Sequence, residues 1–137
     1  MLKKYYNICE CSDFGLLILR VSIGLMMAFS HGLGKLQKAL GDGPVAFADP
    51  IGIGQELSLY LAAGTEFFLA LLLCIGLFTR LVSIPLAFTM LVAAFVVHVD
   101  DPFAKKEFAL LYLMPFLLFI FAGGGKYSID GLLKKKF

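Results

Sequence analysis

Four ionisable side chains lie inside or at the ends of long apolar runs, where each is costly to place. They are Arg20 and His31 in the first run, Glu66 in the second and His98 at the end of the third. Ionisable residues within membrane spans usually face a bundle interior and mark functional sites. Histidine titrates near neutral pH and a desolvated carboxylate can hold a proton, so this set could exchange protons with a bound molecule. We therefore predict that His31, His98 and Glu66 are catalytic.

The elements that must position these residues are four apolar segments. The chain of 137 residues is 60% hydrophobic, against roughly 45–50% in soluble domains, and a membrane-spanning helix needs about 20 predominantly apolar residues. Only Thr79 and Arg80 separate the second segment from the third, which predicts a tight antiparallel hairpin. We predict an all-α membrane protein of one domain, residues 1–137, folded as an antiparallel bundle of four transmembrane helices at residues 14–32, 57–78, 81–97 and 108–123.

The loop between the first two helices, residues 33–56, is long and carries turn signals at Gly41-Asp42-Gly43-Pro44 and Asp49-Pro50. Its interspersed apolar residues indicate that it folds back on the bundle, so we expect a partly folded outer loop. The first segment is too long for a signal peptide and lacks a small-residue cleavage site, so we expect it to be retained.

The distribution of basic residues predicts the orientation. If both termini lie on one side, that side has the larger share of lysine and arginine, including the C-terminal cluster of Lys134, Lys135 and Lys136. Positive charge favours the cytoplasmic side. We therefore place the protein in the bacterial cytoplasmic membrane with both termini in the cytoplasm. The net charge of only +2 indicates no nucleic-acid partner.

On the first helix, Arg20, Gly24, Met27 and His31 follow a helical spacing of i, i+4, i+7 and i+11, which predicts one shared face. Gly24 on that face would let a backbone or a ligand approach closely. Because an unpartnered guanidinium is costly in hydrocarbon, we expect Arg20 to pair with Glu66 on the second helix. A structural alternative is that this pair only fixes the helix register.

The predicted depths place several polar side chains at one level. With a rise of 1.5 Å per residue, His31 and His98 each lie about 25 Å along their helices, near the outer boundary. Glu66 lies about 13 Å and Tyr112 about 6 Å below the outer ends of theirs. We expect one outer-half cavity that all four side chains face. The alternative for the histidines is a place among the lipid headgroups.

Two other kinds of site receive less support. Two histidines and a carboxylate would suit Fe(II) or Zn(II), but no pair of these ligands has a local metal-binding spacing, so we predict no metal. Cys9, Cys11 and Cys74 form no disulfide framework, and we interpret them as reduced thiols. The alternative for Cys9 and Cys11, which form a Cys-x-Cys pair, is a redox or metal role. The sequence also contains no haem, flavin or iron–sulfur motif.

Several stretches in order resemble the DoxX family of small four-helix membrane proteins. They cover about residues 14–131 and are Arg20 followed by His31-Gly32-x-x-Lys35-Leu36, Phe47-x-Asp49-Pro50-x-Gly52, Glu66 before Gly76-x-x-Thr79-Arg80, His98, and Gly123-x-Gly125-x-Tyr127-Ser128-x-Asp130. The resemblance implies an association with quinol- or quinone-linked oxidoreductases or with superoxide and thiol detoxification. More distant relatives act as cargo receptors or assembly chaperones.

These observations favour a quinone-interacting or redox-associated accessory subunit, with quinone as the expected cofactor. Such a chain is an enzyme only as a component of a quinone-linked oxidoreductase that needs a partner. We expect Arg20, Gly24, Lys35 and Tyr112 to contribute to ligand binding. The alternatives are a non-enzymatic membrane chaperone or assembly factor, and a small-molecule or proton pathway running from Arg20 to the outer cavity. Expected partners are the lipid bilayer, a membrane or redox protein, and a second copy of the chain.

Overall fold

The computed structural model describes the backbone of residues 2–134 and the side chains of residues 11–134. Over this range the chain is helical and contains no strand. Cys9 therefore lies outside the described side chains. The helical elements, three of which are π-helical segments marked η, are α1 (Leu2–Met26), η1 (Met27–Gly32), α2 (Leu33–Ala39), α3 (Gln55–Ala63), η2 (Gly64–Leu69), α4 (Ala70–Ile75), α5 (Thr79–Val92), η3 (Ala93–Val97), α6 (Phe103–Ala122) and α7 (Ile129–Lys134).

The protein is a membrane protein. Three of its described helices are long and apolar enough to cross a bilayer, namely Cys11–Ala39, Gln55–Ile75 and Thr79–Val97. The first continues past its predicted end at residue 32, so Lys35 lies on a helix and not in the loop. The predicted fourth span forms α6, whose early turns carry Lys105, Lys106 and Glu107. That α6 crosses the membrane stays a prediction.

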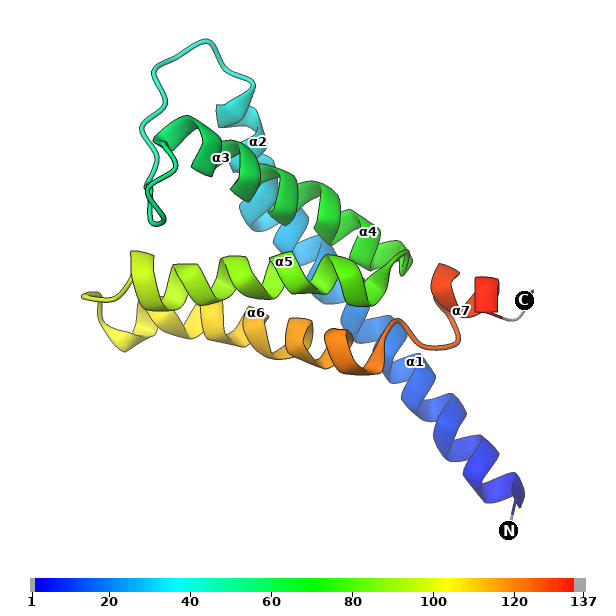
Figure 1. The fold of residues 1–137 in the computed structure, drawn as a ribbon. Helices are drawn as coiled ribbons and strands as arrows, with labels where there is room; N and C mark the ends of the chain where they lie inside the picture. Colours follow the sequence, from blue (N-terminus) through cyan, green and yellow to red (C-terminus); the bar gives the residue numbers. More distant parts are fainter. Residues whose placement is uncertain (1, 135–137) are drawn as a thin grey trace.

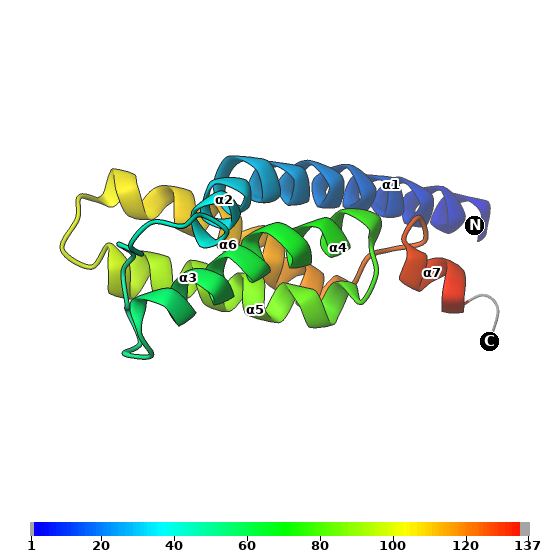
Figure 2. The same cartoon turned by 90° about the horizontal axis from the view of Figure 1, so that it is seen from above.

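The helices form two crossing layers (Figure 1). In one layer α1 packs against α4, η1 against η2 and α2 against α3, while in the other α5 packs along α6. Both views place the loop of residues 40–54 and the α5–α6 turn at one end, which we call the loop end (Figure 2). The α4–α5 turn and α7 lie at the opposite end, which we call the terminal end.

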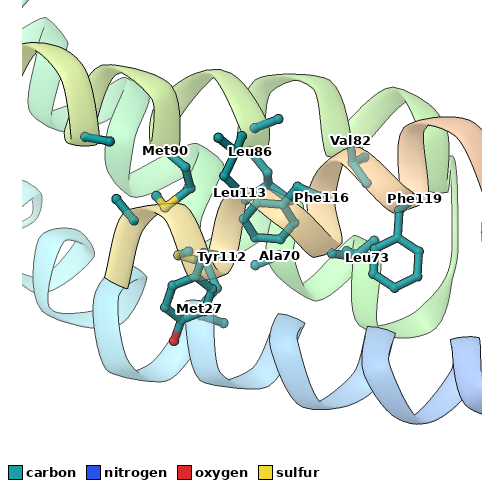
Figure 3. Close-up of a cluster of buried hydrophobic side chains, with 14 residues drawn as sticks. Met27, Ala70, Leu73, Val82, Leu86, Met90, Tyr112, Leu113, Phe116 and Phe119 are labelled. Atoms are coloured by element: carbon teal, nitrogen blue, oxygen red, sulfur yellow. The ribbon is translucent and has the colours of Figure 1, made fainter. Parts of the chain in front are cut away.

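The core lies where the two layers meet (Figure 3). Its largest fully buried apolar side chains include Met27 from the first layer and Leu86, Phe116 and Phe119 from the second. Lipid tails are as apolar as leucine, so close packing stabilises helix association in a bilayer more than the hydrophobic effect does. This packed centre holds the polar groups at the two ends of the molecule apart.

Asp130 connects the C-terminal segment to the start of α5. Its carboxylate accepts hydrogen bonds from the backbone N–H groups of Phe78, at 2.8 Å, and Thr79, at 2.7 Å. Its own N–H donates to the carbonyl of Gly76 at 3.0 Å. The first N–H groups of a helix have no partner within the helix, and a negative charge there is favourable. Asp130 is therefore a cap supplied from a distant part of the chain.

This cap predicts a pH-dependent stability. Burial acts to raise the pKa of Asp130, but the N–H groups of Thr79 and Phe78 and the charge of Lys134 outweigh it and lower the pKa below the usual 3.8. A lowered folded-state pKa contributes stability that is present above the unfolded pKa and is lost as the pH falls through the folded value. We expect Asp130→Asn to unfold at a lower temperature than the wild type at pH 7, with a difference that narrows below pH 4. Thermal unfolding in detergent across this range measures it, and a difference that stays constant with pH would contradict the cap.

Candidate ligand pocket

Glu66 is paired with Lys35. Glu66, in η2, is only 2% exposed, and both of its carboxylate oxygens accept hydrogen bonds from the ammonium group of Lys35 on α2. A buried carboxylate needs a cation of this kind. The pair joins the first helix to the second near the loop end. The predicted pair of Arg20 and Glu66 is therefore wrong, and Lys35 provides the countercharge.

Arg20 instead binds the C-terminal end of α4. Its guanidinium donates to the carbonyls of Leu73 at 3.2 Å, Cys74 at 2.6 Å and Tyr127 at 3.1 Å. The last carbonyls of a helix lack intrahelical donors and carry the negative end of its dipole, so a cation is stabilised there. Arg20 is 1% exposed, and its hydrogen-bond acceptors among the described residues are these carbonyls.

The two polar sites are distant along the second helix. Glu66 precedes Leu73 by seven residues, or roughly 10 Å of helix rise. Met27, Ala70 and Leu73 are all fully buried in the core between them. The predicted pathway from Arg20 to the outer cavity therefore meets packed apolar side chains.

The Lys35–Glu66 pair lies in a pocket of about 440 Å³ near the loop end. The outer loop covers the pocket, and α3, η2, α5 and η3 form its walls. Its lining is mostly apolar, with few polar groups, as is typical of small-molecule sites. The side chains that line it include Phe47, Ile51 and Ile53 from the loop, Leu61, Ala62 and Thr65 from the second helix, and Pro85, Phe88, Val92, Ala93 and Val97 from the third.

His98 also lines this pocket, at the end of η3. Its Nδ1 lies 2.7 Å from an oxygen of Asp101, and Lys105 donates to the other oxygen of that carboxylate at 3.2 Å. The hydrogen bond to His98, followed by that from Lys105, holds the pKa of Asp101 below its usual range. An ionised Asp101 favours a proton on Nδ1, which leaves Nε2 of a neutral His98 as a proton acceptor.

His31 and Tyr112 lie elsewhere. Their rings form an edge-to-face contact, with centroids 5.3 Å apart and planes at 84°. Tyr112 is buried, whereas His31 is exposed, and neither lines the pocket. The structure thus brings Glu66, Lys35 and His98 together but does not place all four predicted side chains in one cavity.

Gly24 is a packing position beside α4. A Cβ atom built on it would lie 2.5 Å from Sγ of Cys74 and 2.8 Å from the carbonyl oxygen of Ala70. The predicted close approach at Gly24 is therefore to the backbone of a neighbouring helix. Gly24 does not line the pocket. Its role in ligand binding stays a prediction.

Asp49 holds the outer loop over the pocket. Its carboxylate accepts hydrogen bonds from the N–H groups of Ile53 and Gly54, both at 2.9 Å, and from the hydroxyl of Ser58 at 3.0 Å. The hydrogen bond from Gly54, supported by that from Ser58, lowers the pKa of Asp49. The predicted fold-back of the loop is thus explained by one side chain of the Phe47-x-Asp49-Pro50 stretch. The sequence did not predict that the apolar residues around Asp49 line a pocket, although the Phe47-x-Asp49-Pro50 stretch contains some of them.

The three π-helical segments lie around this region. Thr65 and Glu66 belong to η2, Ala93 and Val97 belong to η3, and η1 packs directly against η2. A Cβ atom on Gly32 would lie 2.5 Å from the backbone carbonyl of Glu66, so these two segments are in backbone contact. π-helical turns are rare and often occur at functional sites, which supports a site at this level.

Comparison with known proteins gives a family and two similar chains. The DoxX family model matches residues 15–99. A protein of Haemophilus influenzae, named only as uncharacterized, is 31% identical over 95% of this chain and 98% of its own length. The Bacillus subtilis protein named "Putative oxidoreductase CatD" is 31% identical over 90% of each chain. No solved structure matches the chain significantly.

Proposed function

We propose that this chain, which belongs to the DoxX family, binds the head group of a quinone in its pocket and serves as a redox-associated accessory subunit. One observation carries the proposal: the Lys35–Glu66 pair and His98 are the charged or titratable groups of a mostly apolar pocket. A quinone needs hydrogen-bond donors for its carbonyl oxygens and an apolar surface for its ring. The name of the Bacillus subtilis relative supports a redox role.

Lys35 has the donor capacity that a quinone carbonyl requires. Its ammonium group has three N–H bonds, and the two oxygens of Glu66 accept two of them. The third N–H can donate to an oxygen of the ligand. Glu66 is almost fully buried whereas Lys35 is 28% exposed, so Lys35 is the member of the pair that touches the ligand, while Glu66 holds it in place.

His98 would exchange the proton. With Asp101 on Nδ1, Nε2 can accept a proton from a hydroxyl group of a bound quinol and return it to water through the half-exposed ring. A bound quinone supplies two-electron, two-proton chemistry. The electrons would pass to or from a partner oxidoreductase, since the chain contains no haem, flavin or iron–sulfur motif.

The proposal includes a membrane arrangement. We propose that α6 is a fourth span, that both termini face the cytoplasm of a bacterial cell, and that the loop end lies in the outer leaflet. This arrangement is supported by the packing of α6 along α5 and by the basic residues near the C-terminus. The pocket then opens within reach of the membrane's own quinone.

The test is quinone binding by the purified protein in detergent. We expect Lys35→Met to weaken binding of ubiquinone and menaquinone by about tenfold or more, because a desolvated carbonyl oxygen loses its donor. Lys35→Met also leaves Glu66 unpaired, so the double variant Lys35→Met/Glu66→Gln separates folding from binding: it should fold normally and still bind weakly. The matched control is Lys38→Met, one turn along the helix and outside the pocket. It removes only an exposed hydrogen bond to the carbonyl of Ala46 in the loop and should bind like the wild type.

His31→Ala distinguishes the two placements of the site. Retained quinone binding agrees with the pocket that contains Lys35 and His98, whereas lost binding would favour the cavity predicted around His31 and Tyr112. If neither ubiquinone nor menaquinone binds the wild-type protein or accompanies it through purification, the proposed function is wrong.

A further inference from the structure

The mouth of the pocket is lined by apolar side chains that are otherwise exposed. Leu61 on α3 is 54% exposed and Phe88 on α5 is 55% exposed, yet both line the pocket. Ile51, Ile53 and Val97 near the loop end are also exposed lining residues. Leu61 and Phe88 lie farther from that end along their helices, so they mark where the pocket opens sideways. We call the opening between Leu61 and Phe88 the mouth.

The depth of the mouth corresponds to the hydrocarbon of the bilayer. Leu61 lies six residues after the start of α3, or roughly 9 Å along the helix, and Phe88 lies ten residues before His98, or roughly 15 Å. One leaflet contributes about 15 Å of hydrocarbon. In the proposed membrane arrangement, an opening at this depth faces acyl chains and not water.

Access from the loop end is restricted by the outer loop. Phe47, Pro50 and Ile51 cover that side of the pocket, and the hydrogen bonds of Asp49 hold this stretch of chain in place. Two hydroxyl groups of the lining are already used, because Ser58 donates to Asp49 and Thr89 donates to the carbonyl of Pro85. The loop side chains that line this side of the pocket are all apolar, so they offer a water-soluble ligand no hydrogen-bonding side chain.

From these observations we propose that the ligand enters sideways from the bilayer through the mouth, and that it is a quinone with a long apolar tail. The head group lies against Lys35 and the tail leaves between Leu61 and Phe88 into the acyl chains. This inference rests on the proposed function and deepens it, because it selects membrane-dissolved, tailed quinones over tail-less quinones that arrive from water. It also makes Leu61 and Phe88 residues that determine specificity.

The first measurement tests the position of the mouth. The chain contains no tryptophan, so Leu61→Trp and Phe88→Trp each introduce a single fluorescent indole. In nanodiscs of phosphatidylcholine, brominated acyl chains should quench both indoles as strongly as those of Phe68→Trp and Ile84→Trp. These controls replace exposed apolar residues that do not line the pocket and that lie in the same two spans, Gln55–Ile75 and Thr79–Val97. Absence of quenching at positions 61 and 88 would overturn the proposal.

The second measurement compares a long-tailed ubiquinone with 2,3-dimethoxy-5-methylbenzoquinone, which has the same head group and no tail. The wild type should bind the tailed ligand more tightly. The bulky indole in Leu61→Trp or Phe88→Trp should weaken binding of the tailed ligand roughly tenfold, the equivalent of about two methylene groups removed from contact. Binding of the tail-less ligand should change less than about twofold, and the two control variants should bind both ligands like the wild type.

The outcomes separate this inference from the proposed function. If the wild type binds both ligands equally, or if the mouth variants weaken both alike, the sideways entry is wrong while quinone binding stands. If the wild type binds neither ligand, the proposed function fails and the inference fails with it. A phospholipid recovered from the pocket in place of quinone would also overturn the choice of ligand.

Discussion

Arg20→Leu is expected to lower the free energy of unfolding by about 3 kcal/mol or more, and Glu66→Gln should not restore it. The substitution removes the donor to the carbonyls of Cys74 and Tyr127, while the carbonyl of Leu73 keeps a hydrogen bond from Gly76 N–H. Each buried carbonyl left without a donor costs about 1–3 kcal/mol, and the guanidinium also fills space between three segments. Thermal unfolding in detergent measures the loss.

The control for Arg20→Leu is Arg80→Leu, which removes an exposed arginine at the same terminal end and should change stability by less than about 0.5 kcal/mol. Because Arg20 and Glu66 are not partners, the effects of Arg20→Leu and Glu66→Gln should add in the double variant. A double variant more stable than Arg20→Leu alone would reinstate the predicted Arg20–Glu66 pair and contradict the structure.

Gly76→Ala should lower the free energy of unfolding about as much as Arg20→Leu does. Gly76 ends α4 with φ of +73°, a left-handed conformation that residues with a side chain rarely adopt. Holding alanine in this conformation alone costs about 1–3 kcal/mol. A Cβ atom there would also overlap with the guanidinium of Arg20 and with Cβ of Ser128. The methyl group would therefore displace Arg20 from the carbonyls it binds. We expect a total loss of about 3 kcal/mol or more, from the backbone conformation and the lost hydrogen bonds together.

Gly34→Ala is the matched control for Gly76→Ala. Gly34 lies in α2 with nothing within 4 Å of its Cβ position, so alanine should be neutral or stabilise the helix by about 0.5–1 kcal/mol. The unfolding temperature should therefore fall for Gly76→Ala and stay unchanged or rise for Gly34→Ala. Equal losses from both would show that the chain is intolerant of any added methyl group, and that Arg20 has no special share in the effect.

The sequence predicted the helical elements well because hydrophobic runs separated by turn residues determine them. The tight hairpin between the second and third helices and the return of the loop near Asp49 were both visible in the residues. The turn of the hairpin is formed by residues 76–78, however, and Thr79 and Arg80, predicted to connect the helices, already belong to α5.

Helix ends were predicted less well. Lys35 and Lys38 are charged and were therefore assigned to the loop, but a lysine can extend its apolar stem along a helix and still place its ammonium group among polar groups. Because Lys35 was assigned to the loop, it was not recognised as the partner of Glu66.

The placement of His31 failed for a geometric reason. The predicted face of Arg20, Gly24, Met27 and His31 assumes an unbroken α-helix, and its first three members are indeed buried. From Met27 the chain becomes π-helical, with more residues per turn, so His31 rotates away from that face and becomes exposed. The amino-acid composition of this segment does not predict a π-helical turn, and the spacing of hydrophobic residues alone cannot locate one.

The cap that Asp130 provides for α5 has a consequence for the order of assembly. Residues 123–130 are synthesised after α1 to α6, yet they supply the carboxylate at the start of α5 and the Tyr127 carbonyl for Arg20. Until this segment has been synthesised, the Arg20 guanidinium and the first N–H groups of α5 lack these partners. The terminal end can therefore close only after all of α1 to α6 have been synthesised.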